Sequence, residues 1–172
     1  MSVYVVLAIA FAAVLVGGFA IGRFRARRLK AEYAAGNRRI LVPFSGTLDR
    51  TVLAAAIRIA RAEEALLVPA YLLVVPLQYP ENSAQKDKVA VALPLLEAVE
   101  HEALKAGVPV DARIEKGRSL THALRRLWDV ERFDRIVAPA TGFDAKELAW
   151  ILTHAPAETL VLRPAPLAEA AA

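Results

Sequence analysis

The sequence predicts an α/β domain on a five-stranded parallel sheet, preceded by one membrane-spanning helix. Five short aliphatic and β-branched runs follow one another between residues 40 and 164, and segments with apolar residues at helical spacing separate them. Strands that alternate with helices in this way form βαβ units, whose strands are parallel. Nearer the N-terminus, residues 3–22 carry no charged side chain. These observations divide the 172 residues into an apolar N-terminal segment and one globular domain.

The apolar segment Val3–Gly22 has the length of a membrane span. As a helix, its 20 residues would measure about 30 Å, the thickness of the hydrocarbon core of a bilayer. A buried helix usually has polar residues on one face, and a cleaved signal peptide carries its positive charges before the apolar run. Here the charges follow the run, which predicts an N-terminus outside and a domain in the cytoplasm. They are Arg23, Arg25, Arg27, Arg28 and Lys30.

The positive charge of the chain is concentrated in its first 39 residues. The whole sequence has 22 basic and 18 acidic side chains, but seven basic residues and only one acidic residue, Glu32, precede residue 40. The remainder is slightly acidic, which argues against a nucleic-acid-binding domain. We expect residues 23–39 to form a basic juxtamembrane linker that can bind anionic lipid, and residues 165–172 to form a disordered tail. The absence of cysteine excludes disulfides, thiol catalysis and cysteine-ligated zinc.

The domain begins with a strand, Ile40–Phe44 (ILVPF), which ends at a Ser-Gly turn. Thr47 or Asp49 is the expected N-cap of the helix that follows. This helix, Leu48–Ala65, places apolar residues at helical spacing on one side and arginines on the other.

The second strand is predicted at Leu66–Val75, a continuous apolar run typical of a strand buried on both faces. Because proline donates no backbone hydrogen bond, Pro69 predicts a bulge or a late start of this strand. The polar segment Pro76–Asp87 is expected to be a loop. A long helix, Lys88–Ala106, follows despite Pro94, which is expected to kink it.

The second half of the domain is predicted to contain three more strands with a helix between each strand and the next. The strands are predicted at Val108–Glu115, Phe133–Pro139 and Thr159–Leu162. The helices between them are predicted at Leu120–Glu131 and Ala145–Thr153. Trp128 and Trp150 have helical spacing from apolar neighbours, so they are expected in the core or in a dimer contact.

Three stretches of the domain resemble the universal stress protein family. They are ILVPFSGTLDRTVLAAAIRIARAEEALLVPAYLLVVP at the start, then IEKGRSLTHALRRLWDVERFDRIVAP, then LTHAPAETLVLRP, in that order, and together they span roughly Arg39–Pro164. The resemblance implies the strand order 3-2-1-4-5 with helices on both faces of the sheet. It also implies a homodimer formed through the last strand, Thr159–Leu162, because many members of the family dimerise there. Such pairing would cover an exposed sheet edge.

Ligands of such sheets bind at the carboxyl ends of the strands, near the switch point of the topology. Many members of the family bind ATP there through a loop of the form G-x-x-G-x9-G-S/T, whose backbone amides surround phosphates. Aligned on this pattern, Pro139 replaces the first glycine and Gly142 matches the second. The last pair of the pattern, G-S/T, falls at Leu152-Thr153 in one alignment and at Asp144-Ala145 in another. Neither pair contains the glycine.

The resemblance therefore implies the fold with a degenerate ATP site. At the first strand, Ser45 stands where the family commonly has an acidic residue that contacts the nucleoside. The residues that would surround a vestigial nucleotide are Ser45, Gly46, Arg118 and Gly142. Arg118 has a second interpretation, because it follows a predicted strand and would face an anion at that edge. We expect no bound cofactor, with ATP as the alternative.

Neither a metal site nor a catalytic site is indicated by the sequence. His101, His122 and His154 fall on three different helices or helix ends, and Glu97 with His101 fits a solvated helix face better than a weak metal site. Ser45 lacks the G-x-S-x-G motif that activates a serine nucleophile. An enzyme such as a phosphatase or an ATPase would need an activated group that the sequence does not contain.

These observations predict a non-enzymatic, membrane-anchored regulatory or interaction module on the cytoplasmic face. Similar domains occur beside or fused to transporters, so the resemblance implies a transporter or another membrane protein as partner. The alternative is a stress sensor that retains ATP or AMP binding at the strand-end cleft. Saturable nucleotide binding distinguishes the two.

Overall fold

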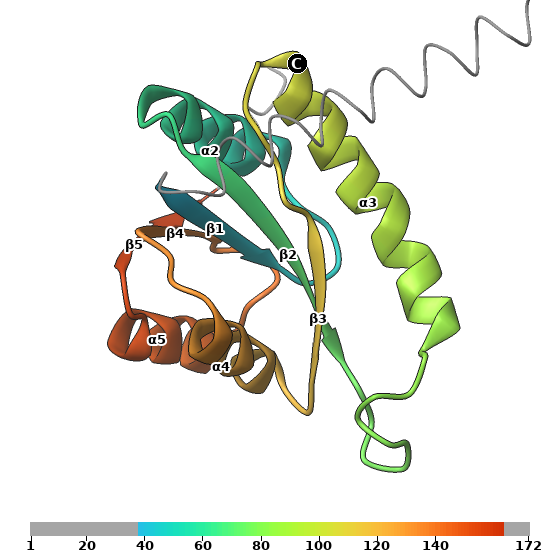
Figure 1. Ribbon diagram of the computed structural model, residues 1–172. Helices are drawn as coiled ribbons and strands as arrows, with labels where there is room; N and C mark the ends of the chain where they lie inside the picture. Colours follow the sequence, from blue (N-terminus) through green and yellow to red (C-terminus); the bar gives the residue numbers. More distant parts are fainter. Residues whose placement is uncertain (1–37, 164–172) are drawn as a thin grey trace, which may run out of the picture.

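The computed structural model describes residues 38–163, which form strands and helices in strict alternation (Figure 1). The elements are β1 (Arg39–Phe44), α2 (Arg50–Ala62), β2 (Leu66–Val74), α3 (Lys86–Lys105), β3 (Arg113–Gly117), α4 (Leu120–Val130), β4 (Arg135–Pro139), α5 (Ala145–His154) and β5 (Glu158–Leu162). None of these helices is long and apolar enough to cross a membrane. The predicted span Val3–Gly22, nearly all of the linker and the tail 165–172 lie outside the described residues.

The strands form one parallel sheet in the order β3-β2-β1-β4-β5, as expected. Helices α2 and α3 cover one face of this sheet, and α4 and α5 cover the other (Figure 1). The chain moves outward from β1 to β3, then returns to the other side of β1 at β4. The switch point of the topology therefore lies between β1 and β4, and the loops that follow these two strands meet there.

The core consists of two layers, one on each face of the sheet. Alternate residues of β1 serve the two layers: Ile40 and Val42 pack under α2, whereas Leu41 packs under α4 and α5. Every residue of β1 after Arg39 is buried. Because both faces are covered, the central strands have continuous apolar sequences instead of alternating ones.

Pro69 does not bulge or delay β2; it interrupts the neighbouring strand instead. Pro69 pairs in register with Val42 of β1, in the middle of an unbroken β2. On the other side of β2, Leu67 forms an isolated bridge with Val110, and regular pairing resumes only between Ala70 and Arg113. Along this edge the residue at position 69 would donate a backbone hydrogen bond to the neighbouring strand, but proline has no N–H to donate. The ladder is therefore broken, and β3 spans Arg113–Gly117 instead of the predicted Val108–Glu115.

Caps explain the other differences from the predicted boundaries. The side chain of Asp49 accepts hydrogen bonds from the amides of Thr51 and Val52, so Asp49 is the N-cap and α2 begins two residues later than predicted. The same helix ends at Ala62 because Glu64 adopts a left-handed conformation with φ of 49°. Arg39, assigned to the linker by sequence, is the first residue of β1. Helix α3 continues through Pro94.

Candidate functional site

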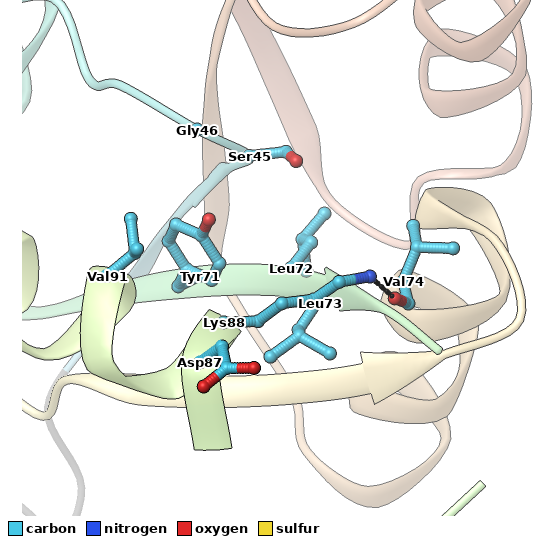
Figure 2. Close-up of a pocket in the computed structure, with 9 residues that line it drawn as sticks. All are labelled: Ser45, Gly46, Tyr71, Leu72, Leu73, Val74, Asp87, Lys88 and Val91. Atoms are coloured by element: carbon cyan, nitrogen blue, oxygen red, sulfur yellow. Dashed lines mark hydrogen bonds between the residues drawn. The ribbon is translucent and has the colours of Figure 1, made fainter. Parts of the chain in front are cut away.

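A pocket of about 490 Å³ lies at the carboxyl ends of β1 and β2, beside the first turns of α3 (Figure 2). The turn after β1, the last residues of β2 and the start of α3 all contribute to it. It is lined by Ser45, Gly46, Tyr71, Leu72, Leu73, Val74, Asp87, Lys88 and Val91. This is the edge of the sheet at which the topology predicts a ligand.

The inner wall of the pocket is apolar and well supported. Tyr71 is only 9% exposed, and its ring packs edge-on against Phe44, with 5.5 Å between the centroids and 89° between the planes. Figure 2 shows the Tyr71 hydroxyl directed toward the side of the pocket where Ser45 lies. Two hydroxyl groups therefore border an otherwise aliphatic wall, an arrangement suited to a flat or apolar group with a polar edge.

Opposite charges lie at the rim, on the first turn of α3. Lys88 Nζ donates a hydrogen bond of 2.7 Å to the carbonyl of Val74, which joins the start of α3 to the end of β2 (Figure 2). Asp87 lies next to it, in the same helical turn. An ammonium has three donors, so Lys88 retains donors for a ligand while Asp87 supplies an acceptor.

At the switch point the two loops are in contact. Gly142, after β4, has a φ of +90°, and a Cβ atom placed on it would lie 2.9 Å from the main-chain oxygen of Ser45. Only glycine allows both this conformation and this approach. Gly142 thus supports the Ser45 turn from outside the pocket and does not line it.

The N-terminus of α5 is closed by the helix's own residues. Asp144 accepts a 2.7 Å hydrogen bond from the amide of Glu147, and the Glu147 side chain accepts a 2.9 Å hydrogen bond from the amide of Asp144. This capping box occupies amides that would otherwise bind an anion and places two carboxylates beside them. In the described fold, this helix start therefore disfavours phosphate.

Arg118 holds the loop between β2 and α3 instead of lining the pocket. Its Nη1 atom donates to the carbonyls of Pro76 and Tyr79, at 2.8 and 2.9 Å. Two more contacts fasten the same loop: Lys116 Nζ donates to the Ser83 carbonyl at 2.8 Å, and Arg126 pairs with Glu81 at 2.8 Å. The guanidinium of Arg118 is thus engaged by the protein.

The structure therefore separates the four predicted site residues. Ser45 and Gly46 line the pocket, Gly142 supports it from behind, and Arg118 lies in the neighbouring loop contact. Sequence reasoning missed Tyr71, Asp87 and Lys88. The rule that sites lie at strand ends could have indicated Tyr71, and the charged triplet Lys86-Asp87-Lys88 after the second loop could have indicated the rim.

Other clusters in the described part of the chain are structural. Trp128 and Trp150 stack with 5.3 Å between their centroids and 3° between their planes, against the core under α4 and α5. The ring of His154 stacks on Trp150 in turn. Within residues 38–163 no three histidine, aspartate or glutamate side chains gather as metal ligands.

Comparison with known proteins finds similarity in fold to solved structures and no match in sequence. Neither the protein-family models nor the curated proteins contain a match to the sequence. Among solved structures, the universal stress protein UspA from Lactobacillus plantarum is 20% identical, with a TM-score of 0.62, and the match covers 75% of this chain and 99% of that one.

Two similar structures contain nucleotides. The universal stress protein from Archaeoglobus fulgidus in complex with dAMP is 15% identical with a TM-score of 0.57, and the match covers 72% of this chain and 96% of that one. The Arabidopsis thaliana family protein with AMP bound is 15% identical with a TM-score of 0.53, and the match covers 75% and 93%.

The domain is thus a doubly wound α/β domain with a pocket at the carboxyl edge of its sheet. More particularly, it has the fold of the universal stress proteins, including their strand order.

Proposed function

We propose that this protein is a membrane-anchored regulatory or interaction module with a universal-stress-protein fold on the cytoplasmic face. The observation that carries this proposal is the capping box of Asp144 and Glu147, which occupies the helix start where a phosphate-binding loop would be expected. A domain that keeps the fold and closes this site to anions is better suited to binding a partner or an uncharged ligand than to binding ATP.

The membrane part of the proposal rests on the sequence. Val3–Gly22 is long enough to span a bilayer, and the basic residues after it orient the domain toward the cytoplasm. A domain held there meets membrane proteins at high effective concentration, so we propose a membrane protein such as a transporter as its partner. No catalytic role is included, because Ser45 has no histidine among the residues that line its pocket.

A second candidate function is the binding of a nucleoside monophosphate. It is favoured by the AMP and dAMP in structures of the same fold, and by the pocket's apolar wall with Ser45 and Lys88 at its border. A monophosphate carries less negative charge than a triphosphate, so it suits a pocket whose lining offers Lys88 as its cation beside the carboxylate of Asp87 better than ATP does.

Calorimetric titration of the full chain in detergent with ATP and then AMP tests both candidates. The first predicts no saturable binding at micromolar concentrations of either nucleotide, and saturable ATP binding would overturn it. The second predicts AMP binding that is lost in Val91→Trp, which fills the pocket, and kept in Leu93→Trp. Val91 and Leu93 are 59% and 48% exposed on the same helix, but only Val91 lines the pocket.

The membrane anchor has its own test. After alkaline carbonate washing of cell membranes, we expect the full chain in the membrane fraction and a chain lacking residues 1–22 in the supernatant. Recovery of the full chain in the supernatant would contradict the anchor without affecting the assignment of the pocket.

A further inference from the structure

A second hollow, of about 250 Å³, lies between α2 and α3, on the face of the sheet that these helices cover (Figure 1). We call it the α2–α3 groove. Its floor is apolar: Val99 is buried, and Leu48, Leu53 and Leu95 pack partly buried against the core. Leu95 and Glu102 of α3 both line the groove, so it extends over about two helical turns, roughly 10 Å. At about 30 Å³ for each water-sized group, it has room for a molecule of roughly eight non-hydrogen atoms.

Two side chains of opposite charge line this groove without pairing. Arg50, the first residue of α2, and Glu102, in the last turn of α3, are both exposed. Within residues 38–163 neither forms an ion pair, with the other or with a third side chain. The carboxylate next to Arg50, that of Asp49, is engaged as the N-cap by the amides of Thr51 and Val52. A ligand can therefore pair with Arg50 and Glu102 without displacing an existing ion pair.

The two charges lie at opposite ends of the groove. Each of the two helices connects parallel strands, so both run from the carboxyl edge of the sheet back to its amino edge. Arg50 stands at the start of α2 and Glu102 near the end of α3, and the helix dipoles have the same polarity as these side chains. The groove therefore favours an anion at its Arg50 end and a cation at its Glu102 end, with apolar surface between them.

We propose that the α2–α3 groove binds a small zwitterion whose carboxylate and ammonium group are separated by an aliphatic chain, the class of the ω-amino acids. The carboxylate pairs with Arg50, the ammonium group pairs with Glu102, and the methylene groups cover Leu53 and Leu95. A diamine would place a positive charge at Arg50, and a dicarboxylate would place a negative charge at Glu102, so both bind less well. The site is separate from the first pocket, and it requires neither the proposed regulatory function nor nucleotide binding.

The probe is ε-aminocaproate, titrated into the full chain in a nonionic detergent and followed by saturation-transfer difference NMR at about pH 8, above the ordinary pKa of histidine. We expect saturable binding with a Kd of about a millimolar, in keeping with the size of the ligand. Hexanoate and hexylamine each lack one charged end and should bind about three-fold more weakly, the effect of losing one exposed ion pair. Equal affinity for all three compounds, or no saturable binding of ε-aminocaproate, overturns the proposal.

A reversal of charge tests the two ends separately. Arg50→Glu is expected to prefer hexamethylenediamine to ε-aminocaproate, and Glu102→Lys is expected to prefer adipate, because each variant then has like charges at both ends. The matched controls are Arg58→Glu on α2 and Glu97→Lys on α3, exposed residues of the same helices that do not line the groove. Both controls should keep the preference for the zwitterion. If the order of preference is the same in all four variants, Arg50 and Glu102 do not hold the ligand and the proposal is wrong.

Filling the groove tests the location of the ligand. Ala98→Trp, at an exposed position of the groove, should abolish binding of ε-aminocaproate, whereas Ala149→Trp on α5 should keep it. Val91→Trp, which fills the first pocket, should keep it as well, and loss of binding in that variant would place the zwitterion in the first pocket. Light scattering of the same proteins tests a second copy as the occupant. A mass that falls in Ala98→Trp alone would assign the groove to a contact between copies, and either of these two results overturns the proposal.

Discussion

Gly142 lies against the main-chain carbonyl of Ser45, so close that a Cβ atom at position 142 would be 2.9 Å from that oxygen. This contact joins the loop after β4 to the turn after β1 across the switch point of the sheet. The contact between Gly142 and Ser45 therefore leaves little room for a ligand between the ends of β1 and β4. The accessible pocket lies to the other side, toward β2 and α3.

Replacing Gly142 by alanine should force these two loops apart. The variant combines a left-handed conformation with a clash against backbone, so we expect it to unfold about 1–3 kcal/mol more easily than the wild type. Gly46→Ala is the matched control, because Gly46 has a φ of +77° and nothing within 4 Å of an added Cβ. Denaturant unfolding of both measures the difference, and equal losses of stability would contradict the importance of the contact.

Arg118 is expected to keep the loop between β2 and α3 ordered. In Arg118→Met the hydrogen bonds to Pro76 and Tyr79 are lost, so the loop should open more often. Leu77 and Tyr79 are 86% and 49% exposed, which makes the loop a substrate for chymotrypsin. We expect cleavage there to be several-fold faster than in the wild type or in Arg58→Met, an exposed arginine of α2. Cleavage at the wild-type rate would contradict this role.

Glu115 should make the stability of the domain depend on pH. Burial raises the pKa of Glu115 above its usual value of 4.5, although Arg113 and Arg126 oppose the shift. A carboxyl group with a raised pKa binds its proton more tightly in the folded state. Its favourable contribution is thus present at pH below the usual pKa and is lost as the pH rises through the raised value.

Glu115→Gln removes this dependence. We expect the variant to have a higher Tm than the wild type at about pH 7 and the same Tm near pH 4, because only the ionised carboxylate is penalised. Thermal unfolding across this range measures it, with Glu97→Gln on the exposed face of α3 as control. A Tm difference that is the same at both pH values would show that burial of the charge is not its cause.

The dimer predicted through Thr159–Leu162 depends on the free edge of β5. Within the described residues β5 pairs only with β4, and its side chains are partly exposed. Val161→Lys places a charge in the middle of this edge and is expected to give monomers by light scattering. Leu152→Lys, at a 58% exposed position of α5, is the control and should leave the mass unchanged. A dimer that persists in Val161→Lys would place the interface elsewhere.

Local pattern predicted most elements of the domain, and its errors have identifiable causes. Buried apolar runs indicated β1, β2, β4 and β5 to within one or two residues. The third strand was misplaced because its start depends on Pro69, which belongs to the neighbouring strand and leaves the ladder without a donor. Such an effect is not visible in the sequence around Val108–Glu115.

The candidate site was predictable in its location and not in its composition. Carboxyl strand ends indicated Ser45 and Gly46, which do line the pocket. Arg118 follows a strand as well, but its guanidinium is bound by carbonyls of a loop that only the folded chain brings beside it. Asp87 and Lys88 join the pocket because α3 returns its first turn to the end of β2.

The sequence by itself determined the alternation of strands and helices, the segregation of positive charge before residue 40 and the absence of a G-x-x-G-x9-G-S/T pattern. These properties are local, since they follow from periodicity, composition and single residue types. Only the tertiary structure decided that Gly142 meets Ser45 and that Arg118 holds the loop at Pro76. The partner of a polar or close-packed group depends on how distant segments meet, and packing of both faces of the sheet sets that arrangement.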